Sequence, residues 1–121
     1  MILRRKLRYI LIESSEDMDI GTASSLALNG LMRFLGEEQY ANANPRLIRQ
    51  YGSRMYALRV NRGTERRAVL GLAFVRSAAD SAGLYTIKTS GSMHSISEYA
   101  SKELHRHSNL ERGQKGPLDK G

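Results

Sequence analysis

The sequence predicts an α+β domain in which a four-stranded antiparallel sheet is covered by helices. Three observations lead to this prediction. In some stretches apolar and polar residues alternate, as in half-buried strands. In others apolar residues recur every three or four positions, as in amphipathic helices. Turn residues, glycine above all, separate these stretches, whose order is strand, helix, strand, strand, helix, strand, helix.

Four strands are predicted, at residues 7–13, 46–51, 55–61 and 84–89. The third is the clearest, because Tyr56, Leu58 and Val60 fall on one face and alternate with Met55, Ala57 and Arg59. In the fourth, Tyr85 and Ile87 are expected on the face opposite Thr86 and Lys88. Gly52-Ser53 and Asn61-Arg62-Gly63 supply the turns on either side of the third strand.

Three helices are predicted. The first runs from Thr22 to Leu35 and ends at Gly36, before a loop at residues 40–44. The second is capped by Thr64 and runs to a loop at residues 77–83; the third covers residues 93–104 after a Ser90-Gly91-Ser92 cap. Residues 1–104 are therefore expected to form a single domain, and residues 105–121 a basic, disordered tail.

The first six elements have the order of the split β-α-β arrangement, with two helices on one face of the sheet. This ferredoxin-like fold is shared by RNA-recognition modules and by many unrelated small domains, so the fold alone does not decide the function.

Composition narrows the classes of function. The chain has 121 residues, 40% of them hydrophobic and 26% charged, which suits one globular domain. No apolar run reaches the length of a membrane span, and no signal-type segment is recognisable, so we expect a cytoplasmic protein with no membrane contact. There is no cysteine, which excludes disulfides and thiolate metal sites.

Positive charge is concentrated in two blocks. Residues 1–8 hold four bases and no acid, and residues 46–67 hold seven arginines and one acid. Between them, residues 9–45 hold six acids and one base, and the net charge of the whole chain is +7. Basic blocks of this kind favour a polyanionic partner such as nucleic acid over simple solubility.

Catalytic and metal-binding motifs are weak. The three histidines, His94, His105 and His107, have no spacing that suits a helical metal pair or a zinc site. No glycine-rich phosphate loop or nucleophile elbow is present, and the acids of residues 13–19 lack the pattern of a two-metal nuclease. We expect no catalytic residue and no cofactor in the protein itself.

The third strand does not have the basic and aromatic pattern with which RNA-recognition modules stack bases. Only Tyr9, on the first strand, matches a stacking position, and a tyrosine buried in a core or by a partner is an equally good interpretation. If the chain binds RNA, arginines and backbone shape are expected to do most of the binding.

Five short motifs, spread over residues 7–100, recur in a known family in the same order. They are Arg8-Tyr9-Ile10, Leu35-Gly36-Glu37, Asn44-Pro45-Arg46-Leu47-Ile48, Leu58-Arg59-Val60-Asn61-Arg62 and Thr89-Ser90-Gly91-Ser92-Met93. With these motifs the chain resembles the archaeal ribonuclease P protein component 2 family, whose eukaryotic relatives are the small Pop and Rpp subunits. Members of the family also place two basic residues at the end of the third strand. One departure is the nearly uncharged segment 94–98, where the family tends to be basic.

The resemblance implies a non-catalytic protein subunit of ribonuclease P, which removes the 5′ leader from precursor tRNA. In that enzyme the RNA subunit performs the hydrolysis with bound Mg²⁺, and a second, barrel-shaped protein subunit is the protein partner. Arg59 and Arg62 are the first candidates for contacts with RNA. The further candidates are Arg4, Arg5, Lys6, Arg8, Arg46, Arg49, Arg66, Arg67 and Lys88.

Two helices are apolar on more than one side, which predicts a protein interface. Leu28 and Met32 form a second patch on the first helix, and Leu70 and Phe74 do so on the second. The surface would be buried by the partner subunit, by a second copy or by a neighbouring helix of the same chain. The alternative function is a small interaction or ligand-sensing domain of the same fold, whose basic face would be incidental.

Overall fold

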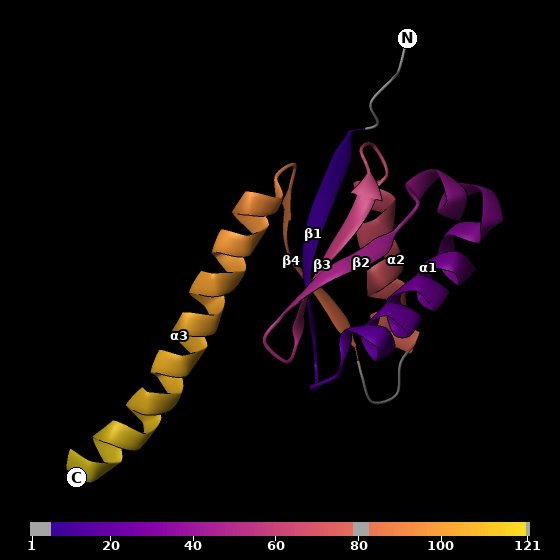
Figure 1. Ribbon diagram of the computed structural model, residues 1–121. Helices are drawn as coiled ribbons and strands as arrows, with labels where there is room; N and C mark the ends of the chain where they lie inside the picture. The colour runs from indigo at the N-terminus through magenta and orange to yellow at the C-terminus, as the bar shows by residue number, and fades with distance from the viewer. Residues whose placement is uncertain (1–5, 79–82, 121) are drawn as a thin grey trace.

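The computed structural model describes residues 6–78 and 83–120, and for residues 76–78 and 107–120 it describes the backbone alone. The elements are, in chain order, β1 (Leu7–Ser14), α1 (Ile20–Ala43), β2 (Arg46–Tyr51), β3 (Met55–Asn61), α2 (Glu65–Ala78), β4 (Leu84–Ser90) and α3 (Met93–Lys120) (Figure 1). The sequence of strands and helices is the one that the hydrophobic patterns predict.

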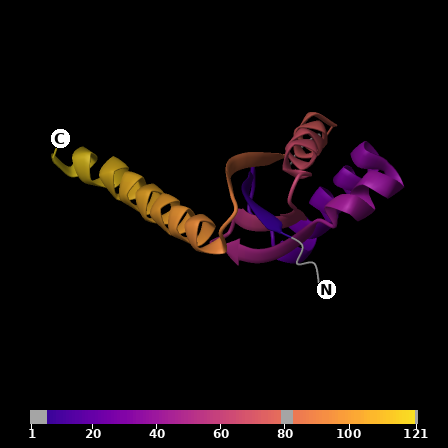
Figure 2. The same cartoon turned by 90° about the horizontal axis from the view of Figure 1, so that it is seen from above.

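The four strands form one open sheet in the order β2-β3-β1-β4, and every neighbouring pair is antiparallel. Helices α1 and α2 lie on one face of this sheet, and α3 lies on the other (Figure 2). The chain is therefore an α+β protein with a four-stranded antiparallel sheet and three helices, which fits a ferredoxin-like layout.

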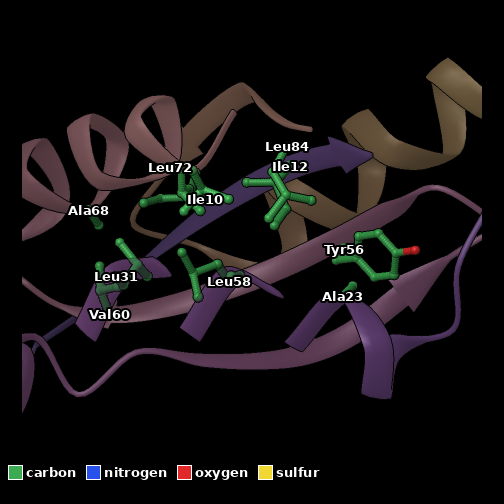
Figure 3. Packing of buried hydrophobic residues seen from close by; sticks show 12 residues of the cluster. Ile10, Ile12, Ala23, Leu31, Tyr56, Leu58, Val60, Ala68, Leu72 and Leu84 are labelled. Carbon is green, nitrogen blue, oxygen red and sulfur yellow. The ribbon is translucent and has the colours of Figure 1, made fainter. Parts of the chain in front are cut away.

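The main core fills the space between the sheet and the helices α1 and α2 (Figure 3). Its buried members are Ile10, Ile12, Ala23, Ala27, Leu31, Tyr56, Leu58, Val60, Ala68, Leu72, Val75 and Leu84. The hydroxyl of Tyr56 donates a hydrogen bond to the carbonyl of Met18, so the largest core side chain also holds the segment that enters α1. The face of β3 predicted to be buried is the face that packs here.

A second, smaller cluster lies on the opposite face of the sheet, under α3. It contains Leu11, Tyr51, Met55, Ala57, Ile96 and Ala100. The strand β3 is thus buried on both faces, whereas the alternation of its residues predicts burial on one. The difference arises because α3 covers the second face, and the hydroxyl groups of Tyr51 and Ser97 lie 2.7 Å apart across this contact.

Two glycines let α1 and α2 pack closely. A Cβ atom on Gly30 would overlap the Cγ2 atom of Val75, and one on Gly71 would lie 2.5 Å from the Cδ2 atom of Leu31. Both positions therefore require the absence of a side chain, because the interior is close-packed and Val75 and Leu31 are themselves buried.

The first helix differs from its predicted extent. Gly36 has the expected positive φ, 83°, but it kinks α1 instead of ending it. A second helical segment continues to Ala43, and Asn44 caps it in the left-handed conformation. The residues after Gly36 include Glu37, Glu38 and Gln39, which are strong helix formers, so the predicted loop at residues 40–44 is mostly helix.

The last two helices also differ in detail from prediction. The Thr64 hydroxyl donates to the carbonyl of Asn61. Ser92 caps α3, accepting a hydrogen bond from the Ser95 amide at 3.3 Å. Helix α3 continues past Leu104 to Lys120, through the segment predicted to be a disordered tail. No glycine or proline interrupts the sequence between Ser92 and Gly113, so the helix has no local reason to stop at residue 104.

Two edge strands carry irregularities that change which side chains share a face. The register of β2 against β3 shifts between Leu47 and Arg49, and the register of β4 against β1 shifts opposite Leu11 and Ile12. The second shift places Lys88 opposite Leu11, on the α3 side of the sheet. Lys88 therefore shares a face with Ile87, which the simple alternation of β4 does not predict.

Replacing Gly30 with alanine should destabilise the domain. Alanine is the better helix former by about 1 kcal/mol, but its methyl group would overlap the buried Val75, and overpacking of this kind costs about 1–3 kcal/mol. We expect a net loss of stability in urea denaturation. The double variant Gly30→Ala/Val75→Ala is the control: it should be more stable than the sum of the single effects predicts, and strict additivity would contradict the close packing.

Candidate nucleic-acid interface

The α3 side of the sheet carries a row of basic side chains at the end where β1 begins and β3 ends. Arg46 of β2 lies directly opposite Arg59 of β3, and Tyr9 of β1 lies opposite Arg59 on its other side. Directly opposed residues of antiparallel strands point to the same face, so these three side chains stand side by side. Arg46 is exposed, and Arg59 and Tyr9 are half-buried.

The next row along the sheet adds Arg49 opposite Ala57, and Lys88 opposite Leu11. The guanidinium of Arg49 lies 5.5 Å from the ring centre of Tyr51, and the ammonium of Lys88 lies 5.2 Å from that of Tyr99. Aromatic rings can hold cations in this way without neutralising them. We call the set Arg46, Arg49, Arg59, Lys88 and Tyr9 the basic strip.

Within the described residues, no carboxylate forms an ion pair with any cation of the basic strip. Arg54, from the same arginine-rich block, behaves differently: its Nε atom donates to the Oδ1 atom of Asp17 at 2.6 Å. This hydrogen bond is the main reason that the pKa of the Asp17 carboxyl lies below its usual value. Arg54 thus joins the β2–β3 turn to the loop before α1, whereas the strip arginines remain available to a partner.

The arrangement of the basic strip is unfavourable for the isolated protein. Like charges placed directly opposite each other on neighbouring strands destabilise a sheet, and Arg46 and Arg59 are such a pair. A polyanion laid along this face would remove the repulsion and would be attracted by all four cations.

Helix α3 crosses this face: it begins at Met93, shortly after Ser90, which pairs with Tyr9. Tyr9 packs against the cluster beneath α3, and Lys88 lies over the ring of Tyr99 on α3. Leu104 of α3 lies beside the β2–β3 turn, where a Cβ atom on Gly52 would be 2.7 Å from the Cδ2 atom of Leu104. Arg46 and Arg59 lie at the opposite ends of β2 and β3 from that turn. Helix α3 thus lies beside Tyr9 and Lys88, whereas Arg46, on the edge strand β2, stays exposed.

The remaining predicted RNA contacts that the structure describes lie in two places. Lys6, Arg8 and Arg62 line a cleft at the same end of the sheet, beyond Arg59. Arg66 and Arg67 are exposed on α2, in the helix layer of the opposite face. Arg4 and Arg5 lie outside the described residues. The predicted set thus falls mainly at one end of the sheet, with the α2 pair apart from it.

The predicted protein interface is partly exposed. The large apolar side chains that remain exposed on α1 and α2 are Met32 (41%), Phe34 (42%), Leu70 (54%) and Phe74 (43%). The rings of Phe34 and Phe74 pack against each other with their centres 5.6 Å apart. Leu28, in contrast, is partly buried against the main core. A groove of about 430 Å³ runs beside Phe74, between α1 and α2.

Other kinds of site find little support in the described part of the chain. No group of three or more histidine, aspartate or glutamate side chains there is placed to hold a metal ion. His94 lies 3.5 Å from Glu98 on the exposed surface of α3. None of the helices described has the length and apolar character that crossing a bilayer requires.

A scan of the chain against models of protein families found no match, and a search of curated proteins also found none. The resemblance to the ribonuclease P family therefore depends on the five ordered motifs alone.

Two features of the site are missed by reasoning from the sequence. Phe34 of α1, which is not among the interface residues predicted from the sequence, is exposed and packs against Phe74. The opposition of Arg46 and Arg59 depends on the register shift in β2, which no local sequence signal announces. The motif Leu58-Arg59-Val60-Asn61-Arg62 places Arg59 and Arg62 at the end of β3, beside the other cations of this part of the sheet.

Proposed function

We propose that this protein is an RNA-binding, non-catalytic subunit of ribonuclease P, and that its sheet and first two helices form the split β-α-β arrangement. Two independent features support the proposal. The five motifs resemble the family in order and spacing, and the basic strip offers a polyanion four cations with no carboxylate partner among the described residues.

The observation that carries RNA binding is the Arg46–Arg59 pair. A sheet gains nothing from two arginines that face each other, so a partner that carries negative charge explains the pair better than stability does. Tyr9, directly beside Arg59, offers a ring on which a base could stack. Phosphates held by the arginines and one stacked base would give binding with little dependence on sequence.

In this function the protein supports the catalytic RNA. The RNA subunit and its Mg²⁺ ions cleave precursor tRNA, and the protein reduces the repulsion between RNA phosphates that the folded RNA brings together. The alternative, a small interaction or ligand-sensing domain, differs in one measurable way: such a domain would bind RNA weakly at every salt concentration.

Replacing Arg46 and Arg59 together with glutamine should weaken binding to structured RNA while the fold persists, because it removes two phosphate-binding cations and relieves their mutual repulsion. The slope of log K against log salt should fall by about 0.7–0.9 for each lost contact. Filter binding at several salt concentrations measures both quantities.

The matched control is Arg33→Gln/Lys102→Gln, which removes the same charge from exposed positions outside the basic strip. Its slope should change much less. Equal losses in the two double variants would mean that only net charge matters, which would contradict a defined interface.

Purification of the protein from its native cells tests the assignment to ribonuclease P. A single structured RNA should copurify, and the complex should cleave precursor tRNA in the presence of Mg²⁺, because the RNA carries the active site in this function. The protein freed of RNA is the control and should not cleave. Cleavage by the RNA-free protein, abolished by one substitution in this chain, would overturn the assignment.

The exposed apolar side chains of α1 and α2, among them the contacting rings of Phe34 and Phe74, support a protein partner, and we propose that they contact the barrel-shaped subunit that the resemblance implies. Exposed apolar patches commonly mark interfaces. The other occupant, a second copy of this chain, would appear as a concentration-dependent dimer of the isolated protein.

The variant Phe74→Ala should weaken association more than it weakens the fold. Phe74 is 43% exposed, so its truncation should cost clearly less than the roughly 3–5 kcal/mol measured for buried phenylalanines. Leu72→Ala, two residues away in the main core, is the control and should destabilise the domain by about 2–5 kcal/mol without a specific effect on association. Denaturation and partner pull-down of both variants measure the difference, and a full core-sized loss for Phe74→Ala would reject its role at an interface.

A further inference from the structure

We propose that a cleft beside the basic strip is a binding site for a single phosphate group. The cleft has a volume of about 370 Å³ and is lined by Lys6, Leu7, Arg8, Arg62 and Gly91. It lies where the start of β1, the β3–α2 turn and the β4–α3 turn meet, at one end of the sheet (Figure 1). The inference rests on the proposed RNA binding and specifies where one phosphate of the RNA is held.

A backbone hydrogen bond joins the two chain segments that carry Lys6 and Arg62. The amide of Arg62 donates a hydrogen bond to the carbonyl of Lys6 at 2.8 Å, which fixes the β3–α2 turn against the start of β1. The side chains of Lys6 and Arg62 are exposed, and no carboxylate among the described residues pairs with either. Both cations are therefore free to bind an anion between them.

The third cation, Arg8, is oriented by Glu65. The Nε atom of Arg8 lies 3.2 Å from the Oε2 atom of Glu65, and the Oε1 atom accepts a hydrogen bond from the Gly63 amide at 2.5 Å. Glu65 therefore occupies one edge of the guanidinium and leaves the Nη groups for another acceptor. Both side chains are about two-thirds or more buried, which reduces screening of this ion pair by solvent.

Gly91 leaves room for the guanidinium of Arg8. A Cβ atom at position 91 would lie 3.0 Å from the Nη1 atom of Arg8, so a larger residue would press on the group that faces the cleft. The Nη1 atom is thus directed towards the β4–α3 turn and away from Glu65.

The geometry favours phosphate over other anions. Lys6, Arg8 and Arg62 bring three positive charges and Glu65 one negative charge, so two positive charges remain in excess. Three cations that approach from two chain segments, the start of β1 and the β3–α2 turn, suit a tetrahedral group with several acceptor oxygens better than a planar carboxylate. The same strand carries Arg59 of the basic strip and leads to Arg62, so an RNA strand on the strip can reach the cleft.

Titration of the protein with inorganic phosphate, followed by amide NMR at constant ionic strength, tests the site. The amides of Arg62, Gly63 and Gly91 should shift together and saturate on one binding curve. The variant Lys6→Gln/Arg62→Gln should lose this curve, and the control Arg33→Gln/Lys102→Gln should keep it. Shifts that never saturate, or that spread equally over all exposed arginines, would mean non-specific ion binding and would overturn the proposal.

The variant Glu65→Gln tests the positioning of Arg8. If Glu65 only repelled anions, its neutralisation would tighten phosphate binding. If it orients Arg8, as proposed, phosphate binding should weaken several-fold although the protein has become more positive. Gly91→Val should weaken binding in the same way while denaturation experiments report a folded domain. Tighter binding in Glu65→Gln would reject its positioning role.

RNA binding by the same variants separates this inference from the proposed function. Loss of the phosphate curve with a smaller salt slope for RNA in Lys6→Gln/Arg62→Gln supports both. The unmodified protein could show no phosphate binding curve while Lys6→Gln/Arg62→Gln leaves the salt slope for RNA unchanged. That result would reject the phosphate site in the cleft but leave RNA binding by the basic strip. A phosphate binding curve without any RNA binding would reject the proposed function but leave the phosphate site in the cleft.

An oligonucleotide with and without a 5′ phosphate then identifies the source of the bound phosphate. Stronger binding of the 5′-phosphorylated oligonucleotide indicates a terminal phosphate, and equal binding of the two indicates an internal one.

Discussion

The structure depends on burial of the two central strands, β1 and β3, on both of their faces. Ile10, Ile12, Leu58 and Val60 pack under α1 and α2, while Leu11 and Ala57 pack under α3. A strand buried on both faces gains hydrophobic stabilisation twice for one set of backbone hydrogen bonds. It also leaves the edge strand β2 and the strand ends as the places where charged side chains can remain in water.

The basic strip follows from this constraint. Leu47 packs against the main core, and it can do so opposite Leu58 only because β2 contains an extra residue at Ile48. With the register that holds from Tyr51 to Arg49, Arg59 would face Leu47. The irregularity therefore buries a leucine and, as a consequence, places Arg46 beside Arg59. The bulge at Ile48 thus determines both the packing of Leu47 in the core and the position of Arg46 on the opposite face.

Helix α3 limits which part of the sheet is available to a partner. It begins beside Tyr9 and Lys88 and reaches the β2–β3 turn with Leu104, near Gly52, while Arg46 on the edge strand β2 stays exposed. The candidate contacts for RNA at this end come from strands and from the turns next to them, whose backbone is fixed by the sheet. Rigid support of this kind lowers the entropy cost of binding, whereas the exposed arginines of α2 stand apart from it.

The sequence by itself determined the order of the elements, the face of β3 that meets the main core, the left-handed conformation of Gly36 and the arginines at the end of β3. These are local properties, set by the period of apolar residues and by the conformations that glycine allows. Only the tertiary structure decided the opposition of Arg46 and Arg59, the exposure of Phe34, the side on which Lys88 lies and the burial of the second sheet face by α3. Each of these depends on how elements far apart in the chain meet, which no local pattern of residues records.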